Sequence, residues 1–229
     1  REAAHMTYAC LVMDHDDTAV QSEATVNYPY FEQAVHTFCP GAEVSLEKYT
    51  SGCYHLGFAQ MCRQWYGFTD KDLEEEFKGW QTYIRTHRPL PYPGIRELLQ
   101  RFRQAGGKIC VVSHSCQENI TRDYKDHFGL LPDAIYGWDL PEEQRKPNTY
   151  PLERIMETYG LEPKNLLVVD DMKPAWEMAN KVGCDIAFAG WGRKNCPEIA
   201  REMEGLCTYH FNSPQELEKM LFEDLTAMV

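Results

Sequence analysis

The sequence predicts an α/β fold in which a parallel sheet carries helices on both faces and is joined to a separate, all-helical region. Two observations lead to this prediction. From residue 95 onward, short apolar runs without turn residues alternate with helix-like segments, which is typical of βαβ units. Between residues 22 and 88, in contrast, apolar residues recur three and four positions apart and no convincing strand is found.

The composition narrows the possible partners. The chain has 229 residues, of which 43% are hydrophobic, and its net charge is −12. This length is ample for one large or two modest domains with a real core. The acidic balance argues against a nucleic-acid surface, which requires a basic patch, and no apolar run is long enough to span a membrane. A small phosphorylated substrate stays possible, because a bound metal can dominate the local field.

The cysteines indicate a reducing environment. All nine are scattered between Cys10 and Cys207, without a Cys-x-x-Cys pair, as in cytosolic proteins with free thiols. Residues 1–6 contain no apolar segment of a secretory signal. We therefore expect a cytoplasmic location. The sequence leaves the oligomeric state open.

The first expected strand, 8–13, is apolar and runs directly into the segment Asp14-His-Asp-Asp-Thr18. Asp17 and Thr18 favour a turn, so Asp14 and Asp16 should lie close together where the strand ends. Carboxylates this close raise each other's pKa unless a cation or a proton intervenes. An Mg²⁺ ion held by carboxylates and phosphate oxygens suits such a pair. The alternative is a solvated acidic turn.

The region that follows is predicted to be helical. The expected helices are 28–38, 56–66 and 73–84. Between them, residues 50–55 are predicted to form a loop by composition. Its polar and aromatic side chains would suit a loop that faces a substrate, and a plain helix–helix connection is the alternative. Three prolines and a glycine within residues 88–94 end the region.

The rest of the chain supplies the remaining strands and helices. Further strands are expected at 108–112, 134–138, 165–169, 185–189 and 207–211. Further helices are expected at 95–104, 119–128, 149–159, 175–182 and 214–220. In open parallel sheets, ligands bind beyond the carboxyl ends of the strands. Ser113 follows one of these strands, and Asp170 and Asp171 follow another, so all three should converge with Asp14 and Asp16 on one edge.

The order of these groups resembles the haloacid dehalogenase superfamily of phosphotransferases. The motifs are Asp14-x-Asp16-x-Thr18, Ser113, Lys146-Pro147 and Asp170-Asp171, each in its strand or loop context between residues 8 and 190. The resemblance implies a Rossmann-like core over residues 7–20 and 89–229. It also implies an all-helical cap domain over residues 21–88. For the hinges between the two parts, we expect residues 20–22 and 89–93.

The resemblance also implies which residues carry out catalysis and the role of each. Asp14 is the expected nucleophile, which attacks phosphorus and becomes an aspartyl-phosphate. Asp16 is the expected general acid, which protonates the leaving oxygen and then activates water as a base. Lys146 would supply a fixed positive charge beside Asp14 and the phosphoryl group. Its neighbour Arg145 is the rival for that role.

The same resemblance implies the binding groups. Mg²⁺ is the expected cofactor, held by Asp14, the backbone carbonyl of Asp16, Asp171 and Asp170. The expected substrate-binding residues are Ser113, His114, Thr18 and, from the cap, His55.

Four positions depart from the family pattern, and one of them, Ala19 in place of a larger apolar residue, carries no inference. His15 stands where the family usually has an apolar residue, and we expect it to pack rather than to reach the substrate. Asp17 replaces the commoner glycine. Ala175 replaces a further aspartate that many members have, and this supports Asp170 as a metal ligand.

The favoured function is an Mg²⁺-dependent phosphatase acting on a small phosphorylated metabolite. A sugar-phosphate mutase of the β-phosphoglucomutase kind shares the core motifs and is the alternative. Asp16 argues against dehalogenation and against phosphonate cleavage, which in similar proteins needs a cap lysine such as Lys48. A non-catalytic phospho-acceptor or binding scaffold is an alternative of another class, and the intact set of motif residues argues against it.

Overall fold

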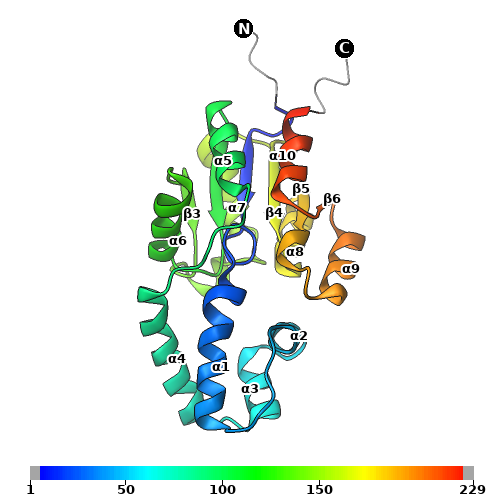
Figure 1. The fold of residues 1–229 in the computed structure, drawn as a ribbon. Coiled ribbons are helices and arrows are strands. Elements are labelled where there is room, and N and C mark those ends of the chain that lie inside the picture. Colours follow the sequence, from blue (N-terminus) through cyan, green and yellow to red (C-terminus); the bar gives the residue numbers. More distant parts are fainter. Residues whose placement is uncertain (1–5, 224–229) are drawn as a thin grey trace. The chain divides into compact units, whose positions relative to one another are not determined.

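The computed structural model describes residues 6–223, and they divide into two compact units (Figure 1). One unit, Gln21–Leu90, is called here the helical unit. The other combines the chain up to Val20 with the chain from Pro91 onward and is called the sheet unit. The helical unit contains the segment 21–88 expected to form a cap, and its action as a cap stays a prediction.

The sheet unit is built on six parallel strands, which confirms the predicted fold class. The strands are β1 (Cys10–Met13), β2 (Lys108–Val112), β3 (Ala134–Tyr136), β4 (Leu166–Asp170), β5 (Asp185–Ala189) and β6 (Tyr209–Phe211). Their order across the sheet is β3-β2-β1-β4-β5-β6. Met13 pairs with Val111 on one side and with Val169 on the other. This register brings the segments after β1, β2 and β4 to the same edge of the sheet.

Helices cover both faces of this sheet (Figure 1). Alternate side chains of β1 point to opposite faces, Leu11 and Met13 to one and Cys10 and Val12 to the other. The first face packs against α5 (Ile95–Gln104), α6 (Gln117–Asp123) with a π-helical turn (Tyr124–Phe128), and α10 (Pro214–Glu223). The second face packs against α7 (Tyr150–Tyr159) and α8 (Lys173–Val182). A further helix, α9 (Pro197–Leu206), lies beside β6.

The helical unit has its own core. A π-helical turn (Glu23–Asn27) leads into α1 (Tyr28–Phe38), and α2 (Leu46–Leu56), α3 (Phe58–Tyr66) and α4 (Asp70–Thr86) follow. The buried residues of this core are Phe31, Val35, Tyr49, Met61, Cys62, Tyr66 and Phe68. Thr69 and Asp72 form a reciprocal capping box that begins α4.

Two sequence-based expectations about elements are wrong. Residues 50–55 are not a loop, because they lie within α2. Ser45 caps this helix by accepting a hydrogen bond from the Lys48 amide at 3.1 Å, and Gly57, with a φ of +79°, ends it. Tyr49 and Thr50 are buried in this helix. Their packing stabilises a helix that the polar composition of residues 50–55 does not indicate. The second error is α9, which the sequence pattern did not reveal.

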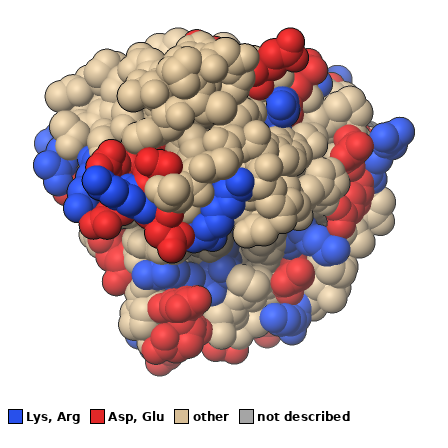
Figure 2. Space-filling model, turned by 90° about the horizontal axis from the view of Figure 1, so that it is seen from below, with Lys and Arg blue, Asp and Glu red and all other residues tan. Residues whose placement is uncertain are grey.

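The structure also bears on the expectations for the cysteines, for membrane spans and for surface charge. All nine cysteines lie within the described residues and are free thiols, as expected. No helix of residues 6–223 has both the length and the apolar character needed to cross a bilayer. Figure 2 shows Lys and Arg side chains interspersed with Asp and Glu on the face that is drawn. The cytoplasmic location stays a prediction.

Candidate active site

The site begins at the end of β1, where the chain turns sharply. The carbonyl of His15 accepts hydrogen bonds from the amides of Thr18, Ala19 and Val20. Asp17 adopts a φ of +59°, in the left-handed region that aspartate tolerates better than most side chains. The turn therefore follows Asp14 directly, and β1 ends at Met13, as the sequence predicts.

Lys146 lies between two of the predicted acids. Its Nζ donates to Asp14 Oδ1 at 2.9 Å and to Asp170 Oδ2 at 2.7 Å. The three side chains are buried, and the peptide bond between Lys146 and Pro147 is cis. Arg145 does not take this position: its guanidinium lies 3.7 Å from the centre of the Trp138 ring and its Nε donates to a backbone carbonyl.

Burial and charge act on these two groups in opposite ways. Burial opposes ionisation of Asp14, but the Lys146 charge and hydrogen bonds outweigh it, so the pKa of Asp14 is lowered. Burial also opposes the charge on Lys146, yet Asp14 and Asp170 together raise its pKa. Asp14 is therefore a carboxylate at neutral pH and Lys146 is an ammonium ion.

Three carboxylates form a group that could hold a metal ion. Oxygens of Asp14, Asp170 and Asp171 lie within 4.8 Å of one another, and the three residues are buried. Burial and the Asp14 charge raise the pKa of Asp170 to about 6. Burial raises the pKa of Asp171 well above its usual value, although Arg193 opposes the shift. Lys146 and Arg193 therefore do not neutralise all of the negative charge of these three carboxylates. Carboxylate oxygens are ligands that suit Mg²⁺, so the group fits this ion.

Asp16 stands apart from this group. Its Oδ2 accepts a hydrogen bond from Ser115 Oγ at 2.6 Å, so its carboxylate turns toward the loop after β2. The predicted contact of its backbone carbonyl with a metal stays a prediction. Ser113 is buried in the same loop, and its Oγ accepts a hydrogen bond from the Ser115 amide at 3.0 Å. That bond leaves the Ser113 hydroxyl hydrogen for another acceptor.

Thr18 and His114 make hydrogen bonds within the site that the sequence did not predict. Thr18 Oγ1 lies 3.2 Å from both Asp14 Oδ2 and Asp171 Oδ1, so its single hydrogen bonds to one of these carboxylates. His114 Nε2 donates to the backbone carbonyl of Lys146 at 2.8 Å. Burial and the Lys146 charge lower the pKa of this imidazole. For both residues, contact with a substrate stays a prediction.

His15 packs behind the turn, as expected. It is buried, its Nε2 donates to Asp123 Oδ2 at 2.8 Å, and its ring stacks on Tyr124 with centroids 5.9 Å apart. The fourth predicted substrate residue, His55, belongs to the helical unit. It lies in the last turn of α2 and packs against the ring of Tyr54.

Sequence reasoning missed Arg193 and Ser115. Arg193 is buried, and its NH2 group lies 2.6 Å from Asp171 Oδ2. It comes shortly after β5, so the rule that functional groups follow strand ends would have found it. Ser115 lies two positions after Ser113, and the same rule covers it.

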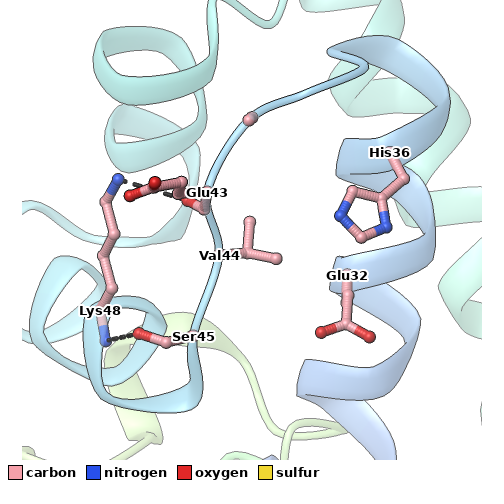
Figure 3. A pocket seen from close by; sticks show the side chains of 7 residues that line it. Glu32, His36, Glu43, Val44, Ser45 and Lys48 are labelled. Atoms are coloured by element: carbon pink, nitrogen blue, oxygen red, sulfur yellow. Dashed lines mark hydrogen bonds between the residues drawn. The ribbon is translucent and has the colours of Figure 1, made fainter.

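The helical unit contains a pocket of its own, with a volume of about 450 Å³ (Figure 3). Its lining residues are Glu32, His36, Ala42, Glu43, Val44, Ser45 and Lys48. The Lys48 ammonium lies 5.6 Å from the ring centre of Trp65 and 5.3 Å from that of Tyr66. It also donates to the carbonyl of Glu43 at 3.4 Å. Phosphonate cleavage would require a lysine from this unit. The contacts hold Lys48, the candidate for that role, against aromatic rings of the same unit.

Comparison with known proteins agrees with the motif order. The sequence profile of the haloacid dehalogenase-like hydrolases matches residues 11–189. A phosphoglycolate phosphatase of Aquifex aeolicus is 33% identical over 135 residues, which cover 54% of this chain and 62% of that protein. The aligned part of this chain therefore spans less than two thirds of that relative.

Solved structures show the same fold at low identity. A predicted phosphoglycolate phosphatase from Haemophilus somnus superposes with a TM-score of 0.70 at 18% identity, covering 93% of this chain and 98% of the other. A subfamily IA hydrolase of the same superfamily from Geobacter sulfurreducens superposes with a TM-score of 0.70 at 13% identity, covering 96% and 99%.

Proposed function

Because the chain belongs to the haloacid dehalogenase-like hydrolase family, we propose that it is an Mg²⁺-dependent phosphatase that works through an aspartyl-phosphate on Asp14. One observation carries the proposal. Asp14 is an ionised, buried carboxylate held 2.9 Å from the Lys146 ammonium, at the strand edge where two further carboxylates lie. Phosphoryl transfer requires a nucleophile and, beside it, positive charge that stabilises the phosphoryl oxygens. Asp14 and Lys146 supply the two.

In the first step, an oxygen of Asp14 attacks phosphorus, and the bond from phosphorus to the leaving oxygen breaks. Asp16 donates its proton to that leaving oxygen, and Ser115 holds the Asp16 side chain through the 2.6 Å hydrogen bond. Lys146 stabilises the negative charge that develops on the phosphoryl oxygens. When bound to Asp14, Asp171 and Asp170, Mg²⁺ would supply further positive charge to those oxygens.

In the second step, water attacks the phosphorus of the aspartyl-phosphate. Asp16, now a carboxylate, takes a proton from this water as the new bond forms. The bond between phosphorus and the Asp14 oxygen breaks, which releases inorganic phosphate and restores the Asp14 carboxylate. Ser113 would donate its hydroxyl hydrogen to a phosphoryl oxygen in both steps.

The substrate is proposed to be a small phosphate ester handled in the cytoplasm. Phosphoglycolate is the first candidate, because the relative from Aquifex aeolicus is named a phosphoglycolate phosphatase. The helical unit is proposed to act as the cap that selects the substrate, with His55 as a contact. Closing over the substrate would exclude bulk water from the reaction.

The test is phosphate release from a panel of phosphorylated metabolites that includes phosphoglycolate and β-glucose 1-phosphate. Wild type is compared with Asp14→Asn, with and without Mg²⁺. Asp70→Asn, at an exposed position, is the matched control. We expect release that needs Mg²⁺, that Asp14→Asn loses and that Asp70→Asn keeps. Isomerisation of β-glucose 1-phosphate without phosphate release would instead favour the mutase.

A further inference from the structure

The candidate metal site contains more charge than its three carboxylates. Four buried aspartates and two buried cations gather at this edge of the sheet unit, and all are less than a tenth exposed. They are Asp14, Asp17, Asp170, Asp171, Lys146 and Arg193. With all four carboxyls ionised, as metal binding requires of its ligands, the aspartates exceed the cations by two in formal charge. That excess equals the charge of one divalent cation.

The two cations serve different pairs of carboxylates. Lys146 contacts Asp14 and Asp170. Arg193 contacts the other two: its NH2 group lies 2.6 Å from Asp171 Oδ2 and 3.7 Å from Asp17 Oδ2. A guanidinium stays charged at every pH that proteins tolerate, so Arg193 contributes a constant positive charge here.

The segment that carries Arg193 is fixed against the turn after β1. The indole Nε1 of Trp191 donates to the carbonyl of Thr18 at 2.8 Å. Gly192 lies so close to the carbonyl of Asp17 that a Cβ atom would be 1.8 Å from its oxygen. Any larger residue at position 192 would clash with this carbonyl, so the position requires glycine. The two contacts together hold Arg193 beside Asp17 and Asp171.

Asp17 lies outside the three-carboxylate group that could share a metal ion, so it contributes charge rather than a ligand. We propose that Asp17 and Arg193 act as a matched pair that sets the charge of the metal site, so that one divalent cation neutralises it. The inference rests on the proposed function, because it concerns the metal site described there. It assigns that site's affinity for a divalent cation to two residues that touch neither the metal nor the phosphoryl group.

Changing either member alone should shift metal affinity in opposite directions. Arg193→Gln removes a positive charge and should strengthen the binding of a divalent cation. Asp17→Asn removes a negative charge and should weaken it, and asparagine tolerates the left-handed backbone at this position. One unit of buried charge a few ångströms from a divalent ion should change affinity about tenfold or more. The double variant restores the excess of two and should return to the wild-type affinity.

The experiment is calorimetric titration of the full chain with Mn²⁺, and then with Mg²⁺, at one fixed pH and without substrate. Wild type is compared with Arg193→Gln, Asp17→Asn, the double variant and Arg193→Lys, each checked for folding by circular dichroism. Arg193→Lys keeps the charge and should stay close to wild type. If Arg193 acted only by orienting Asp171, Arg193→Gln would bind more weakly and the double variant would not recover. Either result overturns the proposal.

The titration separates this inference from the proposed function. Metal binding that follows the expected order, in a protein that hydrolyses no phosphate ester, supports the charge pair and contradicts the phosphatase. An active phosphatase whose variants break the expected order contradicts the charge pair alone. Should Arg193→Gln fail to fold, Asp17→Asn and Arg193→Lys still decide the matter, because unchanged affinity in Asp17→Asn contradicts the proposal.

Discussion

The two units of the chain bury charged side chains in different ways. In the sheet unit, Asp14 and Asp170 share Lys146, and Asp17 and Asp171 share Arg193. The helical unit buries Glu76 on α4, 5% exposed, and no cation among the described residues pairs with it. Burial alone raises the pKa of Glu76 to about 7. Paired buried charge marks the candidate site, whereas unpaired buried charge is an energetic cost to the helical unit.

The largest expected effect comes from removing a shared cation. Lys146→Met leaves Asp14 and Asp170 without their common partner and removes the charge that stabilises the phosphoryl group. We expect kcat/KM on a phosphate ester to fall by roughly a hundredfold to a thousandfold. Lys164→Met is the control, because Lys164 is exposed and pairs with the neighbouring Glu162. A loss of only a few-fold would remove Lys146 from the proposed mechanism.

The next effect concerns the carboxylate that Arg193 touches. Asp171→Asn replaces a charged metal ligand by a neutral one of the same size. The Mg²⁺ concentration that gives half-maximal phosphatase activity should therefore rise by about tenfold or more. Titration of the activity with Mg²⁺ measures this. An unchanged requirement would contradict the assignment of Asp171 as a ligand.

A smaller effect is expected in the helical unit. The folded pKa of Glu76 lies above its unfolded value, so its protonated form is favoured in the folded state. Its stabilising contribution is full below the unfolded pKa, near 4.5, and is lost as the pH rises through about 7. Glu76→Gln should therefore raise the free energy of unfolding by about 2 kcal/mol more at pH 8 than at pH 5.

Urea denaturation at both pH values tests this prediction, with helical signal as the probe. Glu75→Gln is the control, because Glu75 is exposed on the same helix. If both variants respond alike to pH, the burial of Glu76 does not govern its titration.

The smallest effect is expected at His55 in the helical unit. His55→Ala should change the relative rates on different metabolites by a few-fold and should affect a generic aryl phosphate less. Rates on phosphoglycolate, a sugar phosphate and p-nitrophenyl phosphate measure this. Equal loss on all three substrates would argue against a role of His55 in selecting the substrate.

The sheet unit was the easier half to predict from sequence, because its central strands β1, β2 and β4 are mostly buried apolar runs that end at polar residues. Asp14 and Asp170 lie level on neighbouring strands, since the segment after each strand must emerge at the same edge. That rule, with the family resemblance, was enough to place Lys146 among the acids. Arg193 was missed because the same rule was not applied to the segment after β5, where a single arginine matches none of the family motifs.

The helical unit was harder to predict, because composition and packing disagree there. Residues 50–55 contain Ser, Gly and Thr and favour a loop locally, yet they lie within α2. The ring of Tyr49 packs at an angle against that of Phe31, with ring centres 4.9 Å apart, and such tertiary contacts override local preference. Substrate selection is proposed to depend on this unit, and its helices were predicted less well than the strands and acids of the sheet unit.

The most direct test of the account is to detect the phosphoryl group on Asp14. Wild-type protein turning over a phosphate ester with Mg²⁺ would be quenched in acid, digested and analysed by mass spectrometry. We expect one phosphoryl group on the peptide that contains Asp14, sensitive to hydroxylamine as an acyl phosphate is, and absent from Asp14→Asn. Steady turnover without any phosphorylated peptide, or with the group on another residue, would contradict the proposed mechanism.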